Sequence, residues 1–437
     1  MHGLISPAEI KEKIGKEVRL QGWVHDVRVL GGISFVLLRN FKGIVQIAAP
    51  KKTVTPEVYN LISDLHQEDI ITCVGMVKAS EAARLGFEVI PSSVEIVSKA
   101  ATPLPLDPRG ITPASLDTRL QWRSLELRRP ETSAIFKVEN AVVQGFEETL
   151  RAEGFIRAFT PSIIGGVSEG GSEVFKIDFY GKDAFLRQDP QLHRQLTIAG
   201  GFDRIYDLGT NWRAELSHTP RHLSEHRTIA PEMAFIDDET DTMRVQERMV
   251  VGGIRRAIED CGDELALLKM KLESPTTPFP EVTFPQAYDI LKKLGKSLPR
   301  GQDIDEASQR AVAAHVKEES GSDFFFLNRF PSAAKPFYVM RVDDEPEFAR
   351  SVDLVFKGLE LSSGGQREHR HEKIVAQIKE KGYDLEALKW FTEPFRYGVP
   401  PHGGYSFGIE RFVAYLLGIE NIKEATLFPR DPERLQP

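Results

Sequence analysis

The chain has 437 residues, with 56 Lys and Arg against 64 Asp and Glu, a formal net charge of −8 and a pI near 5.9. This length suits two or three domains, and the acidic balance excludes binding of nucleic acid through a general positive field. No apolar run suits a signal peptide or approaches the roughly 20 residues of a membrane span, and only two cysteines occur. We therefore expect a cytoplasmic protein with no membrane association, in which Cys73 and Cys261 are buried small side chains without a disulfide.

Residues 17–99 have the pattern of short β segments separated by turn signals, among them VRLQGWVHDVRV, ISFVLLRN and IVQIAA. Five or so strands in this space are typical of a small barrel of the oligonucleotide-binding (OB) type. We predict an OB-fold domain over residues 1–104. The Pro-rich stretch that follows, ATPLPLDPRGITPASLDTRLQWR, predicts a hinge over residues 105–130.

The pattern changes after residue 130. A long helix is predicted over TSAIFKVENAVVQGFEETLRAEG, and strands and helices follow it in mixed order. A regular alternation of strand and helix would favour a parallel sheet, and this sequence does not show it. We predict an α+β domain built on an antiparallel sheet over residues 131–437.

One stretch of this second domain, NWRAELSHTPRHLSEHRTIAPEMAFI (211–236), holds three Arg, three His and three Glu. Its flanks have the pattern of strands, so the charged middle is predicted to be the loop of a long hairpin. Alternating cations and carboxylates suit a nucleotide, whose phosphates need cations and whose exocyclic amine needs an acceptor. On this stretch alone, a solvated loop with weak surface ion pairs is an equally good interpretation.

Two later segments favour the nucleotide. DLVFKGLELSSGGQREHR places Asp353 and Glu360 on either side of a glycine, and PPHGGYSFGIERF predicts a Gly-rich strand running into a helix that carries Arg411. Carboxylates spaced in this way suit Mg²⁺, which takes one or two protein carboxylates and completes its shell with water and phosphate oxygens.

These segments resemble a known family. EGFIRAFTP, WRAE with the RHLSE loop, and GGYSFGIERF stand in the order of the three signatures of class II aminoacyl-tRNA synthetases. Together with GWVHDVR, LDTRL, SEGGSEVF, DPQL, SSGGQREHR and LFPRDPERL, their spacing is similar to the class IIb aspartyl enzymes of archaeal and eukaryotic type over nearly the whole chain. GIERF alone would be a weak signal, but chance agreement of so many ordered motifs is negligible.

The resemblance implies an ATP-dependent ligase that converts L-aspartate to aspartyl adenylate and passes the acyl group to tRNA(Asp), with tRNA(Asn) as a further acceptor left open. It also implies Mg²⁺ and a homodimer. Two alternatives stay open. One is a paralogue that adenylates a different amino acid or uses a different acceptor, and the other is a non-enzymatic tRNA-binding protein. The second is disfavoured because the residues for ATP and for the metal are present together.

The family's site residues map onto this chain motif by motif. Arg213 matches the arginine that grips the α-phosphate of ATP and stabilises the charge developing there, which is the catalytic role. The other contacts that the resemblance implies are Glu215, Arg221, His222, Glu360 and Arg411 for ATP; Glu169, Gln191, Arg194, Ser363 and Arg367 for aspartate; Asp353, Glu360 and Ser363 for the metal; Arg28, Phe35 and Gln46 for the anticodon; and Ser217 and Thr219 for the acceptor end of tRNA. For Phe35, a core position in a strand is an equally good interpretation.

The chain departs from the family at two positions of the amino-acid site. Where the family usually has SPQLYKQ this chain has DPQLHRQ, so Arg194 replaces a lysine that touches the aspartate side chain. In TIAPEMAF, Ala230 stands where the family commonly has an Asp that binds the α-ammonium. Either Glu169 or Glu232 compensates, or the substrate is not aspartate.

Overall fold

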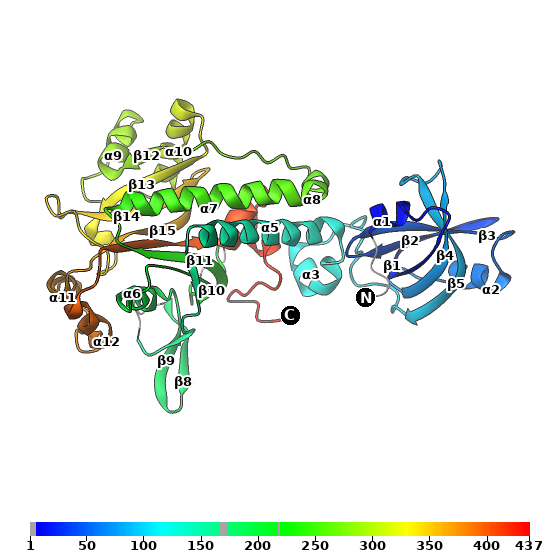
Figure 1. Cartoon of the computed structure of the whole chain (residues 1–437), viewed down its shortest axis with the longest axis horizontal. Coiled ribbons are helices and arrows are strands. Elements are labelled where there is room, and N and C mark those ends of the chain that lie inside the picture. The colour runs from blue at the N-terminus through cyan, green and yellow to red at the C-terminus, as the bar shows by residue number, and fades with distance from the viewer. Residues whose placement is uncertain (1–5, 167–172, 217–218) are drawn as a thin grey trace. The chain divides into compact units, whose positions relative to one another are not determined.

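The computed structural model describes residues 6–166, 173–216 and 219–437. The chain forms two compact units, Met1–Arg129 and Pro130–Pro437, and each is described by itself (Figure 1). Both cysteines are buried and free, as predicted. Within the described ranges, no helix is long and apolar enough to cross a membrane.

The first unit is a closed five-stranded barrel with the strand order β1-β2-β3-β5-β4. Alternate residues of each strand fill its core, as Val36 and Leu38 do in β2 while Phe35 and Leu37 face outward. The predicted OB fold is confirmed. The elements are α1 (Pro7–Lys11), β1 (Glu17–Leu30), β2 (Ile33–Asn40), β3 (Gly43–Pro50), α2 (Pro56–Ser63), β4 (Ile70–Ala79) and β5 (Phe87–Ser98).

The segment between the barrel and residue 130, where a hinge is predicted, contains regular structure. It holds two short helices, α3 (Leu116–Gln121) and α4 (Arg123–Glu126). Ion pairs join it to the barrel, with Arg109 Nη1 3.1 Å from Asp26 Oδ1 and Arg128 Nη1 2.8 Å from the buried Glu68.

The second unit is built on an eight-stranded sheet with the order β12-β13-β14-β15-β16-β11-β10-β6. Its neighbours are antiparallel except at the two edges, where β12 pairs with β13 and β6 with β10 in parallel. The predicted α+β class on an antiparallel-rich sheet is confirmed. The strands are β6 (Ile156–Ala158), β10 (Arg204–Trp212), β11 (Glu225–Ala234), β12 (Glu281–Thr283), β13 (Phe324–Pro331), β14 (Phe348–Phe356), β15 (Leu359–Arg367) and β16 (His402–Gly408).

A small sheet and nine α-helices complete the described part of this unit. The predicted long helix is α5, and the predicted helix with Arg411 is α13. The helices are α5 (Pro130–Ala152), α6 (Gln191–Ala199), α7 (Glu239–Asp260), α8 (Gly262–Leu267), α9 (Phe284–Lys293), α10 (Glu306–Ser320), α11 (His371–Glu380), α12 (Lys389–Thr392) and α13 (Ile409–Leu416), with 3-10 turns at Ser332–Ala334, Glu393–Tyr397 and Ile422–Ala425; the small sheet joins β7 (Ile163–Ile164), β9 (Lys182–Leu186) and β8 (Lys176–Phe179).

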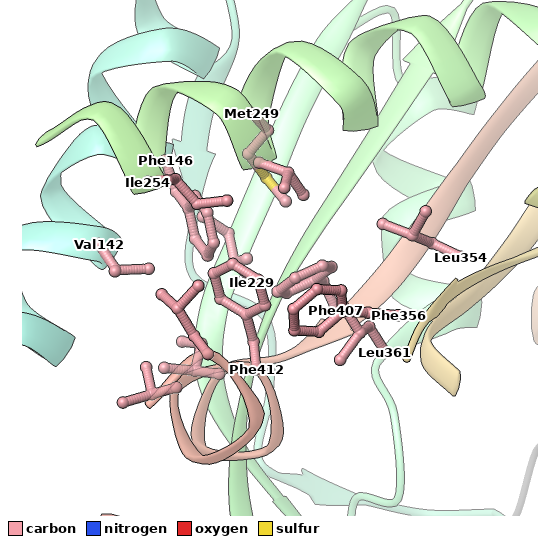
Figure 2. Close-up of a cluster of buried hydrophobic side chains, with 14 of the residues drawn as sticks. Val142, Phe146, Ile229, Met249, Ile254, Leu354, Phe356, Leu361, Phe407 and Phe412 are labelled. Atoms are coloured by element: carbon pink, nitrogen blue, oxygen red, sulfur yellow. The ribbon is translucent and has the colours of Figure 1, made fainter. Parts of the chain in front are cut away.

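The two faces of the large sheet have different chemistry. On one face, α5 and α7 run along the strands, and Figure 2 shows Phe146 of α5 and Met249 of α7 among apolar side chains from the sheet, such as Ile229 and Phe407. Because successive residues of a strand point to opposite faces, the neighbours of these core residues, such as Thr228 and Ser406, face the other side. That second face is polar and carries the candidate site.

Candidate active site

A cavity of about 360 Å³ opens on the polar face of the sheet. Its wall combines side chains from β10, β11, β14, β15 and β16, from the loop after β10 and from α13. Segments that are far apart in the sequence thus meet here. The predicted site residues on this wall are Gln191, Arg213, Glu215, Arg221, His222, Glu360, Ser363, Arg367 and Arg411.

The charged stretch 211–236 is a hairpin, as predicted, but its loop is shorter than predicted. Trp212 pairs with Glu225, so β11 already begins at Glu225. His226 and Arg227 therefore lie in a strand. His226 lines the cavity, while the backbone and side chain of Arg227 donate hydrogen bonds to the buried Glu410, with Nη1 2.6 Å from Oε1.

One end of the cavity, here called the loop end, is formed by Arg213, Glu215, Arg221, His222 and Arg411. Glu215 lies between Arg213 and His222, because Arg213 Nη1 is 3.4 Å from its Oε1 and His222 Nε2 is 3.6 Å from its Oε2. Arg221 forms an ion pair with Glu306 of α10. Arg411 donates to the carbonyl oxygen of Glu360 at 3.0 Å.

The side chains of the loop end are partly open to solvent. Arg213 is 49% exposed and His222 is 41% exposed. Deeper in the cavity, burial lowers the pKa of His226 to about 4, and the nearby Arg213 and Arg411 add to this effect. His226 is therefore neutral at pH 7.

The carboxylates beside the loop end suit a hard cation. Asp353 and Ser363 are cross-strand partners on β14 and β15, and Glu360 lines the cavity nearby. Burial raises the pKa of Asp353 to about 7; Lys335 opposes this shift from 3.4 Å, and the charge of Glu360 adds to it. The described residues contain no cluster of three His, Cys, Asp or Glu able to hold a metal. A cation here would rest on two carboxylates and a hydroxyl, and would complete its shell with water and substrate oxygens.

The opposite end of the cavity, here called the Arg367 end, consists of Asp189, Gln191, Arg194, Glu232 and Arg367. Arg367 donates Nε to Glu232 Oε1 at 2.9 Å and Nη2 to Oε2 at 3.3 Å. Gln191 Nε2 lies 3.3 Å from both oxygens of the same carboxylate. Burial alone would raise the pKa of Glu232, but Arg367 and Arg194 hold it below its ordinary value. The Arg367 end is therefore a closed, ionised hydrogen-bond network.

Arg194 is placed differently from the prediction. Its side chain is fully buried and does not line the cavity. It donates Nη1 to Asp189 and Nη2 to the amide oxygen of Gln191, each at 2.6 Å, and its Nε lies 3.5 Å from Glu232. In this structure Arg194 supports the residues of the wall and does not present a donor to the cavity.

Ala230 is fully buried, so this position does not reach the cavity either. Its cross-strand partner is Asp207, which is ion-paired with Arg187 at 3.2 Å. The cavity residues that the predicted set lacks include four charged or titratable ones, namely Asp189, His226, Lys335 and Glu410. The sequence could have pointed to Asp189, because it stands in DPQLHRQ at the place of the serine in the family's usual SPQLYKQ, the same motif in which Arg194 replaces a lysine.

Four other predicted residues are not placed on the wall. Asp353 is buried and does not line the cavity, although its cross-strand partner Ser363 does. Glu169 and Ser217 lie outside the described residues. Thr219 is exposed, and its hydroxyl contacts His222 Nδ1 at the loop end.

The three predicted anticodon residues share the outer face of the barrel. Arg28 on β1 is the cross-strand partner of Phe35 on β2, and Gln46 on β3 pairs with the next outward residue, Leu37. Gln46 Nε2 is 3.2 Å from Glu88. Phe35 is partly exposed and does not belong to the barrel core, so the core interpretation is wrong, while stacking on an anticodon base stays a prediction.

Comparison with known proteins agrees with this architecture. Residues 115–432 match the family described as tRNA synthetases class II (D, K and N), and residues 18–97 match the OB-fold nucleic acid binding domain. The chain belongs to the class II tRNA synthetases of the D, K and N group.

Within that group, its relatives include the aspartate–tRNA(Asp) ligase of Thermococcus kodakarensis, 46% identical over 431 residues and 98% of each chain. The aspartate–tRNA(Asp/Asn) ligase of Methanopyrus kandleri is 44% identical over 98% of this chain and 97% of its own. Among solved structures, the asparaginyl-tRNA synthetase of Pyrococcus horikoshii complexed with asparaginyl-adenylate has a TM-score of 0.91 and 32% identity, with all of both chains covered. The aspartyl tRNA synthetase of Entamoeba histolytica has a TM-score of 0.90 and 29% identity, covering 100% of this chain and 93% of that one.

Proposed function

We propose that this protein is an aspartate–tRNA ligase, which activates aspartate with ATP and transfers it to tRNA(Asp). The observation that carries the proposal is Arg367, a nearly buried guanidinium on the wall of the cavity, at the end away from the charged loop. Glu232 takes Nε and Nη2 of Arg367, so the remaining nitrogen, Nη1, is the one to donate to a side-chain carboxylate of the substrate, and asparagine would offer it only an uncharged acceptor. The names of the full-length relatives support the same assignment.

In the first step, the residues of the loop end bind ATP. Arg213 contacts the α-phosphate and the carboxylate of the amino acid, so it stabilises the charge that develops at the α-phosphorus. Glu215 accepts from the adenine amine, Arg221 and His222 hold the distal phosphates, and Arg411 lies against the adenine. No general base is needed, because the substrate carboxylate is already a nucleophile and needs only to be held in line.

Asp353, Glu360 and Ser363 are the residues proposed to hold Mg²⁺. Two carboxylates close enough to influence each other, one of them with a raised pKa, fit a divalent cation that would relieve their repulsion. When bound there, the ion would supply positive charge that offsets the negative charge of the pyrophosphate leaving group. Lys335, 3.4 Å from Asp353, already compensates part of the negative charge of these carboxylates.

In the second step, the acyl group passes to the 3′ terminal adenosine of tRNA. We propose that Ser217 and Thr219 lie near the acceptor end, and that Phe35 stacks on an anticodon base while Gln46 and Arg28 contact its neighbours. A homodimer formed through α5 and the edge strand β6 is also proposed. It is supported by exposed apolar side chains at Ile156 and Phe159, beside that edge.

Pyrophosphate exchange with a panel of amino acids tests the assignment. We expect exchange with aspartate and little with asparagine. Strong exchange with a different amino acid would favour the paralogue, for which Arg194 and Ala230 are the specific observations. Tight tRNA binding with no exchange for any amino acid would favour the non-enzymatic alternative.

Phe35→Ala tests the anticodon face. Loss of one stacked base should cost roughly 1–3 kcal/mol in tRNA binding, which is measured as a higher KM for tRNA in aminoacylation. Pyrophosphate exchange without tRNA serves as the control and should be unchanged. If exchange fell as much as aminoacylation, Phe35 would be needed for the fold and not for RNA.

A further inference from the structure

An amino acid in this cavity brings an α-ammonium group, and that cation needs a carboxylate. Among the described residues, the carboxylates on the cavity wall are those of Asp189, Glu215, Glu360 and Glu410. Glu215 belongs to the loop end. Glu360 lies beside Asp353, and Glu410 accepts hydrogen bonds from the backbone and side chain of Arg227. Of the four, Asp189 is the one that belongs to the Arg367 end.

Glu232, the other acid of the Arg367 end, is not available to a substrate. It is 0% exposed, and both of its oxygens accept from Arg367 and Gln191. A methyl group at Gly404 would collide with it and with the carbonyl oxygen of Pro231, so the network is closely packed on this side. Ala230 offers no polar atom.

Asp189 is held in place and still reaches the cavity. Its Oδ1 accepts from Arg194 Nη1 at 2.6 Å, and the side chain of Ser406 donates a second hydrogen bond. Its side chain keeps 13% of its surface exposed. Burial alone would raise the pKa of Asp189, but Arg194 and the further donors hold it below its ordinary value, so the group is a carboxylate at neutral pH.

The position of Asp189 also suits an amino acid that spans the cavity. Asp189, His226, Arg213, Arg411 and Arg367 line the same cavity, and the charge of Asp189 is close enough to interact with His226 and with Arg367. A substrate with one carboxylate toward Arg213 and the other toward Arg367 would place its α-ammonium between them.

We propose that Asp189 is the carboxylate that binds the α-ammonium of the amino-acid substrate, and that Arg194 is the positioning residue that fixes it. The inference rests on the proposed function only in requiring an amino acid in this cavity. The planar guanidinium of Arg194 holds Asp189 and Gln191 at once through two nitrogens, which a lysine ammonium cannot do with the same geometry.

A pair of ligands separates this role from a merely structural one. Aspartate and succinate share both carboxylates, and succinate lacks the ammonium. We expect Asp189→Asn to weaken aspartate binding by about 10- to 100-fold, the loss of one charge-assisted hydrogen bond. Succinate binding should stay the same or tighten, because a repelling charge is removed. Both are measured by calorimetry on the full chain, with ATP binding as the control for folding.

Two further variants sharpen the result. Asp189→Ser removes the carboxylate with a smaller side chain and should give the same selective loss. Arg194→Lys should weaken aspartate less than Asp189→Asn does and leave succinate unchanged. Equal weakening of aspartate and succinate in the Asp189 variants, or no change in either, would overturn the proposal.

The same experiment distinguishes failure of this inference from failure of the proposed function. If the wild type activates another amino acid and not aspartate, the pair becomes that amino acid and its analogue without the amino group. A selective loss in Asp189→Asn then still supports the ammonium site although the substrate differs. An unselective result with aspartate as the confirmed substrate overturns the ammonium site alone.

Discussion

The two ends of the cavity are both charged, but they are built in different ways. At the loop end the side chains come from the hairpin loop and the start of α13, are partly open to solvent and contact one another at 3.4 Å or more. At the Arg367 end the side chains come from α6 and the residues just before it, from β11 and from β15, are almost fully buried and form a network with contacts as short as 2.6 Å. One end is loosely held, and the other is fixed before any ligand arrives.

This difference has a physical reason in the ligands that the ends are proposed to bind. ATP is large and brings several charges, so it can organise flexible arginines around its phosphates. An amino acid is small and offers few contacts, so discrimination requires groups that are already in place and already free of water. The difference predicts that breaking the buried Glu232–Arg367 pair at the Arg367 end lowers stability, whereas substitutions at the loop end affect ligands and rate with little effect on stability.

The largest expected effect follows from Glu232→Gln. Removing this charge leaves the guanidinium of Arg367 buried with no carboxylate among its described hydrogen-bond partners, which typically costs about 3–5 kcal/mol of unfolding free energy. Urea denaturation of the wild type and the variant measures this loss of unfolding free energy. The matched control is Glu215→Gln at the loop end, which should change the unfolding free energy by less than about 1 kcal/mol. Similar losses for both variants would remove the distinction between the two ends.

Arg213→Ala should give the opposite pattern. We expect the rate of pyrophosphate exchange to fall on the order of 10²- to 10³-fold, because one preorganised charge contact to the reacting phosphate is lost. The unfolding free energy should change little, since the side chain is half exposed. Arg255→Ala, an exposed arginine on α7 with a long contact to Glu259, is the control and should leave both quantities unchanged. Near-normal exchange in Arg213→Ala would argue against the proposed role of this residue.

Burial of the Arg367 end should also appear in the pH dependence of stability. His402 is fully buried beside this network, and burial lowers its pKa from 6.5 to about 4. The folded state binds this proton less tightly than the unfolded state, so the contribution is fully present above pH 6.5 and is lost as the pH falls toward 4. The loss amounts to at most about 3 kcal/mol. The unfolding free energies of the wild type and of His402→Gln, measured between pH 7.5 and pH 4.5, report this loss. If the two free energies changed with pH in parallel, His402 would not be shielded and water would reach this end.

Much of the fold and of the cavity wall could be predicted from the sequence. The alternation in ISFVLLRN and the long apolar period of α5 are local patterns, and the barrel and the helix formed where they indicated. Arg213, Arg367 and Arg411 lie in motifs whose resemblance to the class II synthetases predicted that they would share one site, and all three line the cavity.

The remainder depends on contacts between segments. Strand β11 begins at Glu225 because it pairs with Trp212, a register that the charged sequence does not reveal. Arg194 lies behind the wall because Asp189 and Gln191 bind two of its nitrogens, and a motif match shows which residue is present but not which way it is turned. Lys335 reaches Asp353 from a separate turn of the chain.

The smallest expected effect concerns Arg221 at the loop end. This cation has two possible partners, namely Glu306 and the distal phosphates of ATP. Its ion pair with Glu306 is exposed, so breaking it should change the unfolding free energy by less than about 1 kcal/mol. Arg221→Gln should raise the KM for ATP about two- to fivefold, the size of one exposed charge contact. Glu306→Gln should lower it, because Arg221 is then released to the phosphates. Arg310→Gln removes the other arginine paired with Glu306 and should leave the KM unchanged, since Arg310 is not on the cavity wall. If Arg221→Gln and Glu306→Gln shifted the KM in the same direction, the ion pair would be positioning the loop and not competing with ATP.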